Sequence, residues 1–134
     1  MTVVVGFVPT PEGWAAIEAA TDAARVAADR LVVVNTSRGD AYADPRYAQE
    51  HHLAELRGRL DAAGVPYEVV QRMRGRDGAE EVLAAAEEHA AGLVVIGLRH
   101  RTPVGKLLLG STAQRILLEA DCPVLAVKAA ATPA

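Results

Sequence analysis

Short apolar runs rich in β-branched residues recur along the chain and alternate with longer stretches of helical spacing. The runs are Val3–Val5, Leu31–Val34, Tyr67–Val70, Leu93–Ile96 and Val124–Val127. Their length and the turn residues around them are typical of strands. Within residues 14–28, 53–63, 82–90 and 113–120, mostly apolar side chains recur three and four positions apart, which is the period of an amphipathic helix. The pattern predicts the order β-α-β-α-β-α-β-α-β.

This alternation predicts a doubly wound α/β fold: an open, parallel, five-stranded sheet joined by right-handed crossovers, with helices on both faces. The segment Tyr67–Arg72 mixes polar and apolar residues, as an edge strand does. The last run, Val124–Val127, is apolar throughout, although the last unit added falls naturally at the other edge. Because an exposed apolar edge invites pairing with another chain, we expect a homodimer through this strand. Cover by a loop or by the short C-terminal tail is the alternative.

Helix signals agree with these boundaries. Thr10 followed by Pro11 offers an N-cap and a proline at the first helical position. Gly64 and Gly92 follow the second and third helical stretches, where a residue with positive φ is wanted. Glu80-Glu81 are expected to be surface charges on the third helix.

Composition narrows the class of protein. With 134 residues, 51% hydrophobic and 23% charged, the chain predicts one domain over residues 1–128 and a short flexible tail over 129–134. The formal charge of −3 excludes a global attraction to nucleic acid or to an anionic membrane. The single cysteine, Cys122, cannot form an internal disulfide, and no apolar run approaches the ~20 residues that span a bilayer. We therefore expect a cytoplasmic protein with no membrane segment.

One stretch departs from the acidic balance. From His89 through Leu118 there is no Asp or Glu, whereas basic side chains recur. Gly110-Ser111-Thr112 then opens a helix, whose free N–H groups and positive dipole end favour a phosphate. Ser111 with Gln114 three residues later is also a capping box, which would use the serine for the helix itself. The spacing leaves both interpretations open.

The C-terminal third resembles the signature of the universal stress protein family. Gly97 precedes a basic loop, Gly110-Ser111 opens a helix, and Asp121-Cys122-Pro123 leads into the last strand. The ATP-binding branch of that family carries a glycine, two residues, a second glycine, nine residues and then Gly-Ser or Gly-Thr. His100 stands at the middle glycine. The resemblance covers essentially the whole chain and implies strand order 3-2-1-4-5, a homodimer through the last strand, and an adenine nucleotide between the ends of strands one and four.

The resemblance also assigns residues to that nucleotide site. Those that would cradle phosphates and ribose are Gly97, Gly110, Ser111 and Thr112, and those that would line the adenine pocket are Val34 and Ile96. Val8, followed by Pro9, stands where the family usually has an aspartate that meets the nucleotide. The basic stretch itself suggests a hypothesis, in which His100, Arg99 and Arg101 supply side-chain donors in place of the backbone space of a glycine. The alternative is that they are exposed loop residues beside an empty pocket.

We accordingly expect a regulatory protein that binds ATP, ADP or AMP, with or without Mg²⁺, weakly or in altered geometry. The alternative is a dimeric protein-interaction module that binds no nucleotide. Dedicated catalysis is not expected, since no nucleophile with a base and no paired-carboxylate site can be assigned, although slow ATP hydrolysis stays open. His51 and Glu55 share a helix face, but no further ligand at metal spacing accompanies them, so we expect a solvated face and no metal.

Overall fold

The computed structural model describes residues 1–35, 50–71, 78–98 and 110–129, and within them strands and helices alternate. The strands are β1 (Thr2–Phe7), β2 (Arg30–Asn35), β3 (Tyr67–Gln71), β4 (Ala91–Leu98) and β5 (Val124–Lys128). The helices are α1 (Pro11–Ala27), α2 (Glu50–Ala63), α3 (Gly78–Glu88) and α4 (Ser111–Glu119). Each apolar run that predicted a strand lies within one of these strands.

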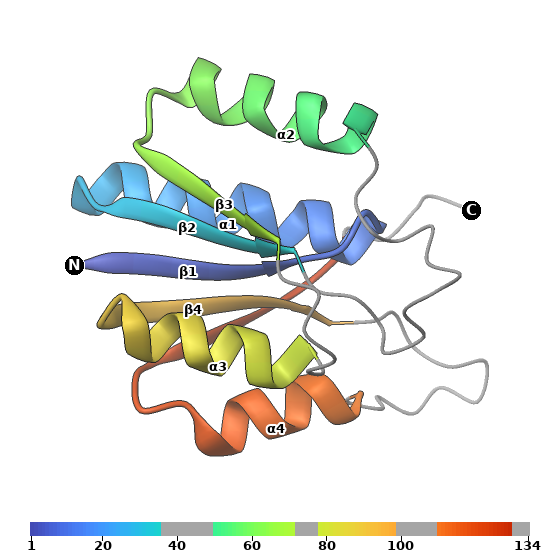
Figure 1. Ribbon diagram of the computed structural model, residues 1–134, viewed down its shortest axis with the longest axis vertical. Coiled ribbons are helices and arrows are strands. Elements are labelled where there is room, and N and C mark those ends of the chain that lie inside the picture. Colours follow the sequence, from blue (N-terminus) through green and yellow to red (C-terminus); the bar gives the residue numbers. More distant parts are fainter. Residues whose placement is uncertain (36–49, 72–77, 99–109, 130–134) are drawn as a thin grey trace.

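The strands form a parallel five-stranded sheet in the order β3-β2-β1-β4-β5, as predicted (Figure 1). Helices α1 and α2 cover one face of the sheet, and α3 and α4 cover the other. The strand order reverses between β1 and β4, and in open α/β sheets that reversal leaves a crevice at the carboxyl ends of the strands.

Each face of the sheet has its own apolar core, because successive side chains of a strand point to opposite faces. On β1, Val3, Val5 and Phe7 pack with α1 and α2, whereas Val4 packs with α3 and α4. All four side chains are buried. Burial on both faces explains why the central strands read as continuous apolar runs.

The two edges of the sheet differ in character. In β3, the residues from Tyr67 to Val70 are half-buried, and Gln71 is exposed. In β5, at the other edge, Leu125 remains 42% exposed. The structure thus places the apolar last strand at an edge, which was the premise of the expected homodimer.

One of the two predicted glycine positions at helix ends is wrong. Gly64 has a φ of +71° after α2, as predicted. After α3 it is Ala90 that takes a positive φ, of 49°, and Gly92 lies inside β4. A Cβ at Gly92 would come within 2.6 Å of the Met1 sulfur, so the glycine there allows close packing of the N-terminus rather than a turn.

The prediction that Glu80-Glu81 are surface charges is wrong for Glu81, which is only 4% exposed. Glu81 falls on the same stripe of α3 as Gly78, Val82 and Ala85, all of them buried. Residues three and four apart share a helix face, so the fold buries Glu81 with this stripe.

Two further expectations concern the tail and a membrane segment. The predicted flexible tail lies outside the described residues beyond Ala129. Across the described helices, none combines the length and apolarity that a bilayer crossing requires.

Candidate functional site

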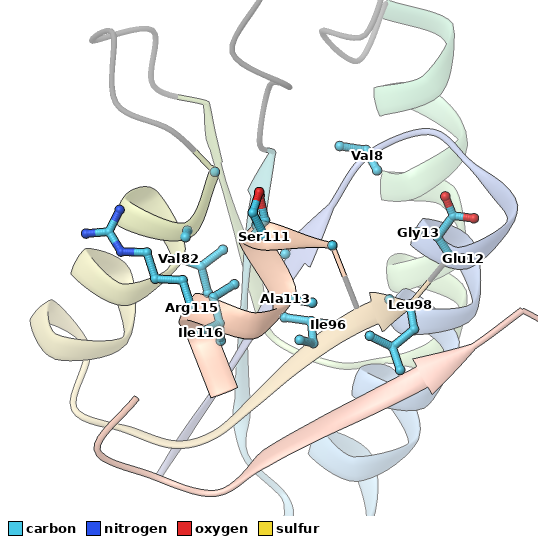
Figure 2. A pocket seen from close by; sticks show the side chains of 16 residues that line it. Val8, Glu12, Gly13, Val82, Ile96, Leu98, Ser111, Ala113, Arg115 and Ile116 are labelled. Carbon is cyan, nitrogen blue, oxygen red and sulfur yellow. The ribbon is translucent and has the colours of Figure 1, made fainter. Parts of the chain in front are cut away.

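A cavity of about 500 Å³ opens at the carboxyl ends of β1 and β4 (Figure 2). Its apolar wall includes Val8, Val82, Ile96, Leu98 and Ile116. The first residues of α1, α3 and α4 also line it, so three helix N-termini converge on one space. The dipole of each helix is positive at that end, and the combined field favours a negatively charged group in the cavity.

The turn that leads from β1 into α1 forms one side of the cavity and is tightly packed. The Thr10 N–H donates to the Val8 carbonyl oxygen at 2.8 Å, and the Gly13 N–H donates to the Thr10 hydroxyl at 3.1 Å. Thr10 is therefore the N-cap of α1, as predicted, and Pro11 begins the helix. A Cβ at Gly13 would lie 1.8 Å from the Val8 carbonyl oxygen, so glycine is required there.

A buried amide fixes the start of the same turn. The Asn35 side chain, in a residue 1% exposed, donates through Nδ2 to the Phe7 carbonyl oxygen at 3.0 Å. Its Oδ1 accepts from Nε2 of Gln71 at 2.9 Å. These two hydrogen bonds join the carboxyl ends of β1, β2 and β3. It holds the peptide directly before Val8 and so helps to set the cavity wall.

Gly97 lets the start of α1 approach the end of β4. A Cβ at Gly97 would lie 2.4 Å from the Glu12 carbonyl oxygen, which is closer than any real Cβ contact. Gly97 lines the cavity as the resemblance implies. Glycine at position 97 also has a structural role, because the lack of a Cβ allows Glu12 and Gly13 to reach the site.

The N-terminus of α4 is open, and the capping-box interpretation is wrong. Gly110, with φ −63° and ψ 157°, is the N-cap, and no side chain of the described residues caps the helix. Ser111 is the first residue of the helix, so its hydroxyl does not take the capping role. Gly110, Ser111 and Thr112 are all exposed and line the cavity. Unpaired N–H groups at a helix start attract anions, and the first turn of α4 holds no acidic residue that would compete.

The charged residues of the described lining are Glu12 and Arg115. Arg115 Nε donates to Glu119 at 2.9 Å, and its Nη1 lies 3.3 Å from Glu80. The contact with Glu80 ties α4 to α3 beside the cavity, whereas Glu119 lies on α4 itself. The Glu12 carboxylate belongs to the first turn of α1 and is half-buried.

The structure brings most of the residues assigned from the sequence together. Those that line the cavity are Val8, Ile96, Gly97, Gly110, Ser111 and Thr112. Val34 is 1% exposed in the core formed with α3 and α4, and neither it nor Pro9 belongs to the described lining. Arg99 and His100 lie outside the described residues.

Sequence reasoning missed the contribution of α1 and α3, including Glu12, Gly13 and Val82. One signal was available. Gly13 sits in the first turn of a helix that is otherwise rich in alanine. Glycine is unfavourable in helices, so its presence there points to a close approach of backbone.

Other candidate groups behave as ordinary surface or core residues. Glu55 pairs with Arg59 at 2.7 Å on the exposed face of α2. Nowhere among the described residues do three or more His, Cys, Asp or Glu side chains lie together as metal ligands would. Burial, together with the negative charge of Asp121, raises the pKa of the Cys122 thiol, which lowers its reactivity at neutral pH. Trp14 packs edge-on against Phe7, with ring centroids 4.8 Å apart, at the margin of the core.

The strand order and the crevice at its switch point define the chain as a doubly wound α/β protein, a class in which ligands bind outside the carboxyl ends of the strands. Comparison with known proteins is more specific. The model of the universal stress protein family matches residues 1–128. A universal stress protein from Mycolicibacterium smegmatis is 48% identical over 126 residues, which cover 94% of this chain and 96% of that one. The chain therefore belongs to the universal stress protein family.

Solved structures share the fold. A universal stress protein in complex with cAMP has a TM-score of 0.68 at 23% identity, with 97% of this chain and 98% of that chain covered. A universal stress protein from Archaeoglobus fulgidus in complex with dAMP has a TM-score of 0.66 at 21% identity, with 96% and 98% covered. At these identities the likeness concerns the architecture.

Proposed function

We propose that this protein binds an adenine nucleotide in the cavity between β1 and β4 and that its role is regulatory. The observation that carries the proposal is the open N-terminus of α4, where Gly110, Ser111 and Thr112 face a cavity without a side-chain cap. The phosphate would lie against this helix start, because the free N–H groups and the dipole favour an anion there. Proteins of the same fold in complex with cAMP and dAMP support this choice of ligand.

The cavity suits a nucleotide in size and lining. Its volume of about 500 Å³ lies within the usual range of small-molecule sites, roughly 300 to 1,000 Å³. Ile96 and Leu98 provide an apolar surface for a base. Val8 adds apolar surface where the family usually has a carboxylate, so one polar anchor is missing and we expect binding to be weak or altered in geometry.

We further infer that the site binds rather than catalyses. The titratable side chains in the described lining are those of Glu12 and Arg115, and Arg115 is held by Glu80 and Glu119. A general base needs to lie within hydrogen-bond reach of the group that it activates. The hydrogen bonds of Arg115 described above go to Glu119 and Glu80 rather than to a nucleophile such as Ser111.

The test is calorimetric titration of nucleotide-free protein with AMP, ADP and ATP, each with and without Mg²⁺, up to near-millimolar concentration. Gly110→Leu is the discriminating variant, because no described residue lies within 4 Å of a Cβ at Gly110, so we expect the side chain to block the ligand without disturbing the described fold. Gly58→Leu, at an equally open position on α2, is the matched control. We expect heat from the wild type and the control and none from Gly110→Leu. Absence of heat from the wild type, with no nucleotide released on denaturation, would favour the interaction-module alternative.

We also infer a homodimer through β5. The support is an apolar edge strand in which Leu125 is 42% exposed. Light scattering coupled to size exclusion at micromolar concentration is expected to give twice the 14.1 kDa mass of the chain. Leu125→Glu should halve this mass, whereas Ala54→Glu on the exposed face of α2 should not. A wild type that runs only as a 14.1 kDa species would reject the dimer.

A further inference from the structure

The two charged side chains in the described lining of the cavity differ in whether they form ion pairs. Arg115 is bound on both sides, by Glu119 at 2.9 Å and by Glu80 at 3.3 Å. The Glu12 carboxylate makes no hydrogen bond or ion pair within the part of the chain that the structure describes. Of these two charged side chains, Glu12 is thus the one without an ion-pair partner among the described residues.

Glu12 is held beside the cavity by its own backbone. Its carbonyl oxygen is pressed against Gly97, where an added Cβ would be 2.4 Å away, and the next residue, Gly13, is hydrogen-bonded to the Thr10 cap. Figure 2 shows the carboxylate extending from the start of α1 on the side of the cavity where Val8 lies. These contacts fix the position of the Glu12 backbone beside the cavity.

A carboxylate at this place restricts how a ligand can lie. An ionised carboxylate is only an acceptor of hydrogen bonds, and a phosphate at neutral pH is anionic and mainly an acceptor too. The phosphate of a nucleotide is thus driven to the α4 end of the cavity, and a hydrogen-bond donor is required at the Glu12 end.

We propose that Glu12 is the specificity residue of this site and accepts a hydrogen bond from a donor on the nucleoside part of the ligand. The inference rests on the proposed function. Nucleosides offer two kinds of donor, the ribose hydroxyls and the exocyclic amine of the base. Both provide the N–H or O–H that an ionised carboxylate binds most strongly.

The experiment measures the affinity of the wild type, Glu12→Gln and Glu18→Gln for four probes. AMP carries both kinds of donor, 2′-deoxy-AMP and 3′-deoxy-AMP each lack one hydroxyl, and inosine monophosphate lacks the exocyclic amine. Glu18 lies exposed on the same helix outside the cavity lining, so Glu18→Gln removes an equal charge as a matched control.

We expect the wild type to lose about ten-fold in affinity for one analogue relative to AMP, which identifies the donor and corresponds to about 1.4 kcal/mol. Glu12→Gln should bind AMP about ten-fold more weakly and no longer distinguish that analogue, while Glu18→Gln behaves as the wild type. Glu12→Asp, which keeps the charge on a shorter side chain, should recover part of the discrimination. Melting temperatures of all variants provide the check on folding.

Three results would overturn the inference. If Glu12→Gln binds AMP as tightly as the wild type or more tightly, Glu12 only repels the ligand. If the variant still distinguishes the analogues, another residue reads the donor. If the wild type binds none of the four probes, the proposed function fails as well. This result can be distinguished from the first two, because in both of those AMP still binds to the protein.

Discussion

Gly13 is the position where the packing of the cavity wall can be tested by one methyl group. Replacing glycine by alanine inside a helix ordinarily stabilises a protein by about 0.5 to 1 kcal/mol. At Gly13 the new Cβ would lie 1.8 Å from the Val8 carbonyl oxygen and 2.9 Å from the Val8 carbonyl carbon. Both are backbone atoms, so the turn from Val8 to Thr10 has to move away from the helix.

The magnitude follows from what that movement breaks. The Thr10 hydroxyl caps α1 by accepting a hydrogen bond from the Gly13 N–H, and loss of such a cap lowers the free energy of unfolding by about 1 kcal/mol. Overpacking of a tight site costs about 1 to 3 kcal/mol more. After the gain in helix propensity, we expect Gly13→Ala to lower the free energy of unfolding by about 2 kcal/mol. For a chain of this length that corresponds to a fall in Tm of roughly 8 °C.

Urea denaturation followed by circular dichroism measures this change, and Gly58→Ala is the matched control. Nothing lies within 4 Å of a Cβ at Gly58 in α2, so the same substitution there should raise the free energy of unfolding by about 0.5 to 1 kcal/mol. Opposite signs at the two glycines are the expected result. If Gly13→Ala stabilises the protein as Gly58→Ala does, the packing of α1 against the Val8 turn is wrong.

Two further predictions concern single side chains. Asn35→Asp removes the amide donor to the Phe7 carbonyl and places a carboxylate at a position that is 1% exposed. By urea denaturation, it should lower the free energy of unfolding by about 2 to 3 kcal/mol at pH 7. The loss should be smaller at pH 4, because a protonated carboxyl group can donate a hydrogen bond again. An equal loss at both pH values would contradict this. Because the raised pKa of the Cys122 thiol lowers its thiolate fraction, alkylation by iodoacetamide at pH 7.5 should be slower in the folded protein than in urea, and equal rates, read by mass spectrometry, would refute it.

Periodicity was sufficient to predict the elements and the doubly wound class, because it reports burial directly, whereas the strand order came from the resemblance to the universal stress protein family. Strands buried on both faces read as apolar runs, and Val3–Val5 and Leu93–Ile96 are the centre of the sheet. Helix ends were harder to predict. Which residue adopts a positive φ depends on the local geometry of the turn. Here Ala90 adopts it, although Gly92 lies only two positions away. Glu81 was missed because its burial depends on how α3 packs in the fold, which composition does not report.

The candidate site was half predictable for a similar reason. Gly97 and Gly110 to Thr112 are close in sequence and carry a recognisable pattern, so their place at the cavity was expected. Glu12 and Val82 come from helices that carry no such pattern, and they reach the cavity because the topology brings the N-termini of α1 and α3 to the same edge of the sheet as α4. The difference between a capping serine and an open helix start is one residue of register at Ser111, which only geometry resolves.

The central claim is that an adenine nucleotide lies in this cavity with its phosphate at the start of α4. The most direct measurement is the change of backbone amide chemical shifts when ¹⁵N-labelled protein is titrated with AMP. The account predicts that, among the described residues, the largest and saturable changes fall on Ser111, Thr112 and Gly97, with smaller ones at Val8 and Glu12. It is contradicted if these amides stay unchanged at near-millimolar AMP, or if the changes fall on β5 and leave the α4 N-terminus unaffected.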